Sequence, residues 1–267
     1  MASTASIYTR VAASRIRAHF QYRLSFVLQV IGSFFLSFLD FVAILVIFHH
    51  LPHLAGWSLG EVAFLYGSSA VMFKLSDILM TNMDRLPVFI RMGSFDQVLT
   101  RPLGTLGQVM TGDLDIRHVG SMTQGALVLW IGVNRVAIDW TPERVIVFVA
   151  MLIGALVIFC SLYVATNAVA FWTMDAREVA NSFTYGGNFM TQFPMHIYGA
   201  WMRRIFAYVI PLGFVNYFPS LYLLGKTDPA GSPPILRFMS PAVALGLAFI
   251  AGSVWRSAVR HYRSTGS

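Results

Sequence analysis

The sequence contains little charge and almost no cysteine. Of its 267 residues only 12% are Asp, Glu, Lys or Arg, whereas 56% are hydrophobic; soluble domains carry about 25% charged residues. A soluble globular protein of this length needs a charged surface, so the composition excludes one, together with disordered, collagen-like and coiled-coil chains. The single cysteine, Cys160, has no partner for a disulfide within the chain. The class that remains is a polytopic membrane protein.

Long apolar runs are what the sequence does have. A bilayer is crossed by a helix of about 20 mostly apolar residues, and six runs meet that length: residues 25–48, 58–80, 119–138, 145–172, 179–198 and 238–258. A further apolar segment, residues 205–224, contains Pro211 and Pro219, which would deprive a continuous helix of hydrogen bonds. Together these runs predict one domain over residues 1–267. It would be an all-α integral membrane protein with six transmembrane helices and a re-entrant helical hairpin between spans five and six.

The net charge of +7 reflects an excess of Lys and Arg, whose distribution along the chain predicts its orientation in the membrane. With six spans, twelve of the nineteen Lys and Arg residues fall on one side, six fall on the other, and Lys74 lies within a span. Basic loops are retained on the cytoplasmic side, so both termini are predicted to be cytoplasmic. The charges are scattered between apolar runs and form no basic face, so we expect a bilayer around the chain and no nucleic-acid partner.

Two stretches outside the spans have mixed character. Residues 4–23 combine arginines with apolar residues at a four-residue spacing, which favours an interfacial helix over a solvated basic tail. The loop at 81–118 is too apolar for a free loop and too short for a domain. It is predicted to form a short helix that docks either on another protein or on the inner ends of the spans.

Charged residues inside the predicted spans are the candidates for function. Each costs about 2.5–3.5 kcal/mol at the centre of a membrane helix, and the four are Asp40, Glu61, Lys74 and Asp77. They would line a polar translocation path or be structural. Lys74 and Asp77 are three residues apart, so a structural ion pair on one helical face is favoured. For Asp40 and Glu61 both interpretations stay open.

Other patterns point to structure. His49, His50 and His53 have a spacing that a metal tolerates, but no Cys, Asp or Glu is close in sequence, so a surface loop is favoured. Small residues recur every four positions in the sixth span, at Ala244, Ala248 and Gly252, and predict close helix packing within the chain or, second, a dimer seam. No catalytic arrangement is recognisable, so no enzyme activity and no cofactor of its own are expected.

Three short motifs carry a family resemblance. They are Gly93-Ser-Phe-Asp96 followed by Leu99-Thr-Arg101-Pro102-Leu103, then Ile210–Pro219 leading into Leu224-Gly225-Lys226, and the ending Trp255–Ser267. In this order they resemble the permease (transmembrane) subunits of type-2 ABC (ABC-2) exporters. The particular branch has a separate ATPase and often two different permeases.

That resemblance implies partners and roles. ATP and Mg would be bound by two copies of a separate ABC ATPase, and a second permease would complete a homo- or heterodimer in a bacterial cytoplasmic (inner) membrane. Gly93, Asp96, Arg101 and Pro102 would belong to the coupling element that touches the ATPase. The segment around Pro211 and Pro219 would cap the outer end of the pathway.

Two other functions compete with an exporter permease. An ion-coupled secondary transporter would use Asp40 and Glu61 as proton or cation sites, but such folds usually show internal repeats and broken helices in matching halves. The sequence shows no repeat and only one broken segment. A membrane enzyme or assembly factor would need a catalytic cluster at a membrane face, and none is evident.

Overall fold

The structure is a computed structural model and describes residue 14 and residues 23–112, 115–173 and 177–263. Within these ranges the chain is helical between its connecting turns and forms no β-strand, which confirms the all-α prediction. The predicted interfacial helix at 4–23 lies outside the described residues, except for residues 14 and 23. The long helices are α2 (Arg23–His50), α3 (Leu59–Met80), α7 (Val119–Arg135), α8 (Pro142–Asn167), α9 (Arg177–Thr191) and α12 (Ser240–His261).

The count of six spans is not confirmed. In the described part of the chain four helical stretches are long and apolar enough to cross a membrane, and a bent pair would make a fifth. Helix α7 has 17 residues and ends because Val136 is extended, three positions before the predicted end at 138. Helix α9 has 15 residues and ends at Thr191, where the prediction ran to 198. Pro194 follows and disfavours helical backbone in the residue before it.

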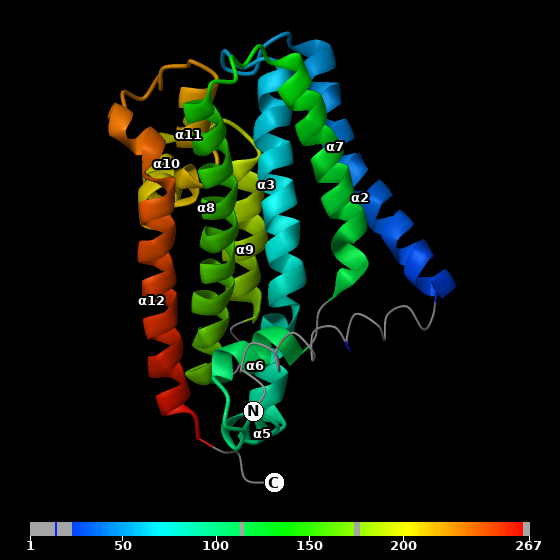
Figure 1. Ribbon diagram of the computed structural model, residues 1–267, viewed down its shortest axis with the longest axis vertical. Helices are drawn as coiled ribbons and strands as arrows, with labels where there is room; N and C mark the ends of the chain where they lie inside the picture. The colour runs from blue at the N-terminus through cyan, green and yellow to red at the C-terminus, as the bar shows by residue number, and fades with distance from the viewer. Residues whose placement is uncertain (1–13, 15–22, 113–114, 174–176, 264–267) are drawn as a thin grey trace.

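The helices form an antiparallel bundle around α3 (Figure 1). Helix α3 packs against α7, α8 and α9, while α2 packs on α7 and α12 packs on α8. Most of α3 is therefore buried, whereas α2 is largely exposed. The end of the bundle that carries α5 (Asp96–Leu99) and α6 (Thr105–Gly112) is called the loop end. The opposite end, with α10 (Ala200–Arg204) and α11 (Tyr217–Leu223), is called the cap end.

Glycines bring α3 and α7 into backbone contact. A Cβ atom added at Gly67 would collide with the backbone of Leu129, and one at Gly132 would lie 2.6 Å from the backbone nitrogen of Phe64. Small residues at a membrane helix interface permit this close approach. At Gly252, in the stripe predicted for the sixth span, an added Cβ would have nothing within 4 Å. A close helix approach therefore lies at α3 and α7, where the sequence pattern did not predict it.

The cap end is built from a broken helical segment. Helix α10 continues into a π-helical turn at Ile205–Val209, and a short 3-10 turn at Leu212–Phe214 precedes α11. The two halves meet at 71°, a geometry shared by a broken span and a re-entrant loop. The break lies at Pro211. Pro219 does not break the chain, because it sits in the first turn of α11, where its missing N–H has no helical acceptor.

The segment at 81–118 folds back onto the bundle. Besides α5 and α6 it contains α4 (Leu86–Arg91) and 3-10 turns at Thr81–Arg85 and Ile116–His118. The fully buried ring of Phe95 lies 5.0 Å from the rings of Phe171 and Tyr262, which stand at the loop ends of α8 and α12. Docking on the ends of the spans, one of the two predicted alternatives, is thus confirmed.

Candidate functional site

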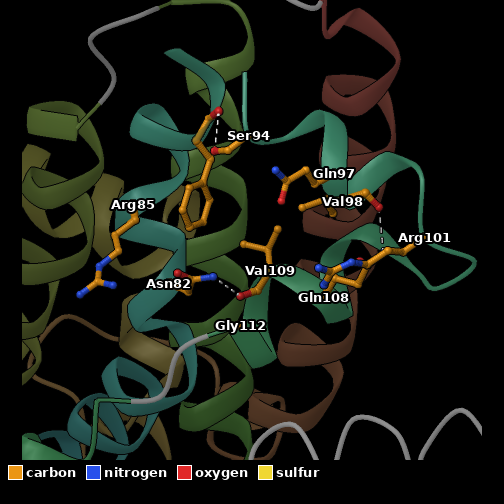
Figure 2. Close-up of a pocket in the computed structure, with 10 residues that line it drawn as sticks. Asn82, Arg85, Ser94, Gln97, Val98, Arg101, Gln108, Val109 and Gly112 are labelled. Carbon is orange, nitrogen blue, oxygen red and sulfur yellow. Dashed lines mark hydrogen bonds between the residues drawn. The ribbon is translucent and has the colours of Figure 1, made fainter. Parts of the chain in front are cut away.

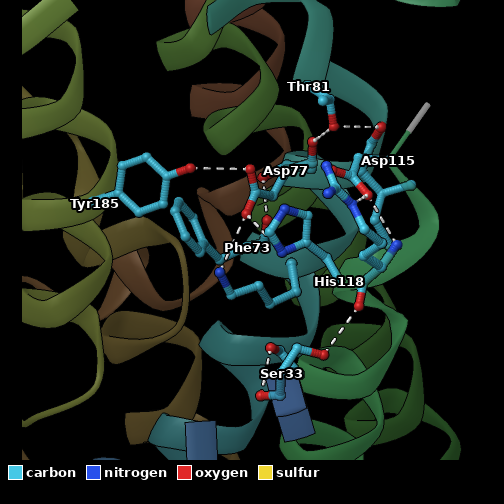
Figure 3. A network of polar contacts seen from close by, with 12 residues as sticks. Ser33, Phe73, Asp77, Thr81, Asp115, His118 and Tyr185 are labelled. Carbon is cyan, nitrogen blue, oxygen red and sulfur yellow. Dashed lines mark hydrogen bonds and ion pairs between the residues drawn. The ribbon is translucent and has the colours of Figure 1, made fainter. Parts of the chain in front are cut away.

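A buried carboxylate, Asp77, is the centre of a polar network inside the bundle (Figure 3). Only 2% of the residue is exposed. Its Oδ2 lies 3.2 Å from the Lys74 ammonium, so the predicted i,i+3 ion pair is present. Its Oδ1 accepts hydrogen bonds of 3.2 Å from the hydroxyls of Tyr163 on α8 and Tyr185 on α9. One acid therefore joins three helices, and its charge is compensated and hydrogen-bonded as a buried charge requires.

The network continues to the loop end through His118. Its Nδ1 lies 3.7 Å from the Asp77 carboxylate, and His118 ends the 3-10 turn that leads into α7. In the same turn Asp115 accepts a 2.6 Å hydrogen bond from Nε of Arg117 and another from its backbone N–H. Burial alone would raise the pKa of Asp115, but these bonds outweigh it and lower the pKa below its usual value. The Ser33 hydroxyl of α2 donates to the Arg117 carbonyl at 3.0 Å, so α2 is tied in as well.

A small polar pocket lies beside Lys74. It has a volume of about 110 Å³, and polar residues of α2, α3, α7 and α9 and of the position after α9 line it: Ser37, Asp40, Lys74, Ser121, Gln124, Asn188 and Gln192. The Lys74 ammonium also lies 5.8 Å from the centre of the Tyr185 ring, which lines the same pocket. Asp40 has neither a hydrogen bond nor an ion pair within the described ranges. The bundle therefore brings a free acid and a paired lysine to one polar space.

Glu61, the fourth intramembrane candidate, lies apart from the other three. It stands in the first turn of α3 at the cap end and forms a capping box with Ser58, whose N–H donates to Glu61 Oε2 at 2.7 Å. Its Oε1 is 3.0 Å from the Lys226 ammonium. A glutamate at this helix position stabilises the helix start, which gives Glu61 a structural role independent of any transport.

The four motif residues of the loop gather around the turn between α4 and α5 and the connection to α6. Gly93 has a φ of 67°, which favours glycine, and Asp96 opens α5. Arg101 and Pro102 are exposed after α5. Next to them is a cavity of about 330 Å³ (Figure 2), whose polar lining comprises Asn82, Arg85, Ser94, Gln97, Arg101 and Gln108.

Internal hydrogen bonds hold the frame of this cavity. The Gln108 amide donates to the carbonyls of Val98 and Leu103, at 3.0 and 2.9 Å, and Asn82 donates to the carbonyl of Val109 at 2.7 Å. These hydrogen bonds stabilise the α5–α6 connection, which carries Arg101 at the edge of the cavity.

Sequence reasoning did not find three members of the network, Tyr163, Tyr185 and His118. Tyrosine in an apolar run fits ordinary burial, and its hydroxyl needs some partner when buried. Nothing in its spacing indicates which partner, because the acid lies on another helix. His118 borders a predicted span, a position where charged residues are common for topological reasons alone.

Within the described residues, an all-helical bundle with four or five helices long and apolar enough to cross a membrane defines the class of multi-pass membrane proteins. The sequence model of a protein family described as "ABC-2 family transporter protein" matches residues 34–266, nearly the whole chain. The chain therefore belongs to the ABC-2 transporter family and is a membrane permease of an ABC transporter, a class that associates with an ABC ATPase. Neither curated proteins nor solved structures give a match.

Proposed function

We propose that the chain is the permease subunit of an ATP-driven exporter and that substrate passes along the α2–α3–α7–α9 face. The observation that carries this proposal is the polar pocket inside the bundle, which both Asp40 and Lys74 line. The chain crosses a bacterial cytoplasmic membrane six times, with α7 and α9 included, and both termini and the loop end face the cytoplasm. The cap-end segment is re-entrant. ATP and Mg are bound and hydrolysed in the partner, and this chain contributes no catalytic residue.

The loop end is the surface that meets the ATPase. Met92 is 71% exposed and Leu99 is 44% exposed, and Arg101 of the same loop is exposed as well. Phe95 anchors the same short helices on the ends of α8 and α12. A movement of these exposed loop residues is therefore transmitted into the bundle, because the short helices that carry them are packed on the ends of α8 and α12.

A second permease covers α2. This helix exposes a continuous apolar face that includes Leu24, Leu28, Phe35, Leu36 and Leu39. Asp40 is exposed on the same helix, and a carboxylate turned to lipid is costly. A neighbouring permease, identical or different, shields that carboxylate, and two permeases bring two ATPase copies.

Charge reversal at the tip tests the coupling surface. We expect Arg101→Glu to weaken association with the co-expressed ATPase about tenfold, which corresponds to roughly 1.4 kcal/mol for the loss of one favourable charge contact. The measurement is the amount of ATPase that co-purifies with the tagged permease, together with the permease-stimulated ATPase rate.

Arg256→Glu is the matched control for this experiment. Arg256 is also exposed near the loop end, but its guanidinium bonds its own helix at the Gly252 carbonyl and Ser253. It should leave association unchanged. If Arg101→Glu and Asp96→Lys both retain full association and stimulation, the coupling surface lies elsewhere.

The energy source distinguishes the exporter from the alternative, an ion-coupled secondary transporter. Asp40, which lines the pocket and has no ion pair among the described residues, would be its ion site, while Glu61 is engaged at the cap end. Purified permease in liposomes without an ATPase should not move substrate when an ion gradient is imposed. Ion-driven transport that Asp40→Asn abolishes would overturn the exporter proposal.

A further inference from the structure

A hydrogen-bonded chain at the cap end contains one histidine with two engaged ring nitrogens. Nε2 of His196 lies 3.0 Å from the Ala55 carbonyl, and Nδ1 lies 3.3 Å from the Tyr217 hydroxyl. That hydroxyl in turn donates to the Asp228 carboxylate at 2.9 Å. The chain thus joins the 51–58 turn to α11 and to the loop that follows it.

The proton positions along this chain are constrained by chemistry. The Ala55 carbonyl only accepts, so Nε2 must carry a proton. Burial would raise the pKa of Asp228, but bonds from the Ser232 side chain, the Ala230 N–H and Tyr217, with the charge of Arg203, lower it below its usual value. Asp228 is therefore an ionised acceptor and takes the single hydroxyl proton of Tyr217.

Nδ1 of His196 then faces a phenolic oxygen that can only accept. In neutral histidine with its proton on Nε2, two lone pairs would oppose each other, or Tyr217 would have to leave Asp228. In the imidazolium form Nδ1 donates to Tyr217 and every bond in the chain is made. Histidine is the side chain whose charge changes between about pH 5 and 8, so protonation adds one hydrogen bond at this point.

We propose that His196 is a proton-binding site that latches the cap segment to the 51–58 turn, closed when protonated and loosened as the pH rises. The site rests on the contacts of His196, Tyr217 and Asp228 alone. Its exposure to the external medium rests on the proposed orientation. In that orientation the latch stabilises the closed outer end of the pathway in an acidic medium.

Two cations and two acids accompany the latch at the cap end. Arg203 and Lys226 are the nearby cations, and Asp228 and Glu61 are the nearby acids, with Lys226 and Glu61 ion-paired to each other. The Trp57 ring centre lies 6.3 Å from the His196 ring and 6.0 Å from Tyr217, where it contributes an aromatic face to the imidazolium.

The turn that receives the latch is shaped to present its carbonyls. Leu54 and Trp57 exchange backbone hydrogen bonds of 2.9 and 3.0 Å, and Ala55 and Gly56 between them have φ values of 51° and 83°. Both central residues of such a tight turn need positive φ. His196 binds the Ala55 carbonyl and Lys226 binds the Gly56 carbonyl at 2.9 Å.

Hydrogen exchange of the full chain in nanodiscs tests the latch. After correction for intrinsic rates, amides in residues 51–58 and 225–231 should be protected about 2- to 12-fold more at pH 5.5 than at pH 8, the factor for one hydrogen bond. His196→Gln should abolish this difference. Tyr217→Phe should also abolish it while keeping the ring stack with Trp57.

Matched controls make the outcome decisive. His261→Gln removes a histidine whose Nδ1 bonds the Ser257 carbonyl of its own helix, far from the cap end, and should retain the full pH effect. Equal protection at both pH values in the wild type, or a pH effect that survives His196→Gln, would overturn the proposal. Nanodiscs expose both faces, so this result does not depend on orientation or on an ATPase. In liposomes, a latch that follows only the pH on the loop-end side would contradict the orientation and leave the proton site intact.

Discussion

Asp77→Ala is expected to lower the free energy of unfolding by about 3–5 kcal/mol, the usual cost of removing one partner from a buried ion pair. The substitution leaves the Lys74 ammonium without its carboxylate and removes the common acceptor of the Tyr163 and Tyr185 hydroxyls. A buried hydroxyl without a partner costs about 1–3 kcal/mol. For a domain of this size the midpoint of thermal unfolding in detergent should fall by roughly 6–20 °C. Size-exclusion chromatography after heating measures it.

A double substitution separates a structural pair from a pathway residue. If Lys74 serves mainly to neutralise Asp77, Lys74→Met in the Asp77→Ala background should recover part of the lost stability, because the uncompensated charge is gone. Tyr185→Phe removes a single hydrogen bond and should cost only about 1 kcal/mol. A near-wild-type midpoint for Asp77→Ala would show that this network does not hold the helices together.

Asp40→Asn provides the functional contrast. Asp40 is exposed and has no bond within the described part of the chain, so the stability should be unchanged. Under the proposed function transport should fall, whereas Asp77→Ala, at a residue that does not line the pocket, should reduce transport only as far as folding does. The pattern distinguishes residues that line the path from residues that support it.

Four of the predicted spans could be located from sequence because apolar length is a local property set by bilayer thickness. Helices α2, α3, α8 and α12 fall within a few residues of their predicted bounds. Helix α7 ends at Arg135 instead of 138, where Val136 is extended, and α9 ends at Thr191 instead of 198, ahead of Pro194. Hydropathy averaged over a window does not register either feature.

Only those contacts of the candidate site that lie within a single helix could be predicted from the sequence. The Lys74–Asp77 pair follows from a spacing of three on α3, and it is present. The tyrosines that complete it come from α8 and α9, and their arrival depends on which faces pack together. Asp40 and Glu61 were considered together because both are acids in apolar runs. Glu61 instead caps α3 and pairs with Lys226, a partner 165 positions along the chain.

The importance of Gly67 in α3 could not be predicted from the sequence for the same reason, because it depends on the packing of α7 against α3. Replacing Gly67 with valine should cost more than 3 kcal/mol and should greatly reduce the folded protein recovered. The first added atom would meet the Leu129 backbone, which cannot turn aside as a flexible side chain can. Gly67→Ala should cost about 1–3 kcal/mol by the same collision.

The sign of the alanine effect makes this test specific. In a helix interior alanine is better than glycine by about 1 kcal/mol, so an unobstructed glycine should gain stability on substitution. Gly252 of α12 meets that condition, because an added Cβ there has nothing within 4 Å. Gly252→Ala should therefore hold or raise the unfolding midpoint in the same detergent assay, while Gly67→Ala lowers it. A rise for both would mean that α3 and α7 stand further apart than these contacts require.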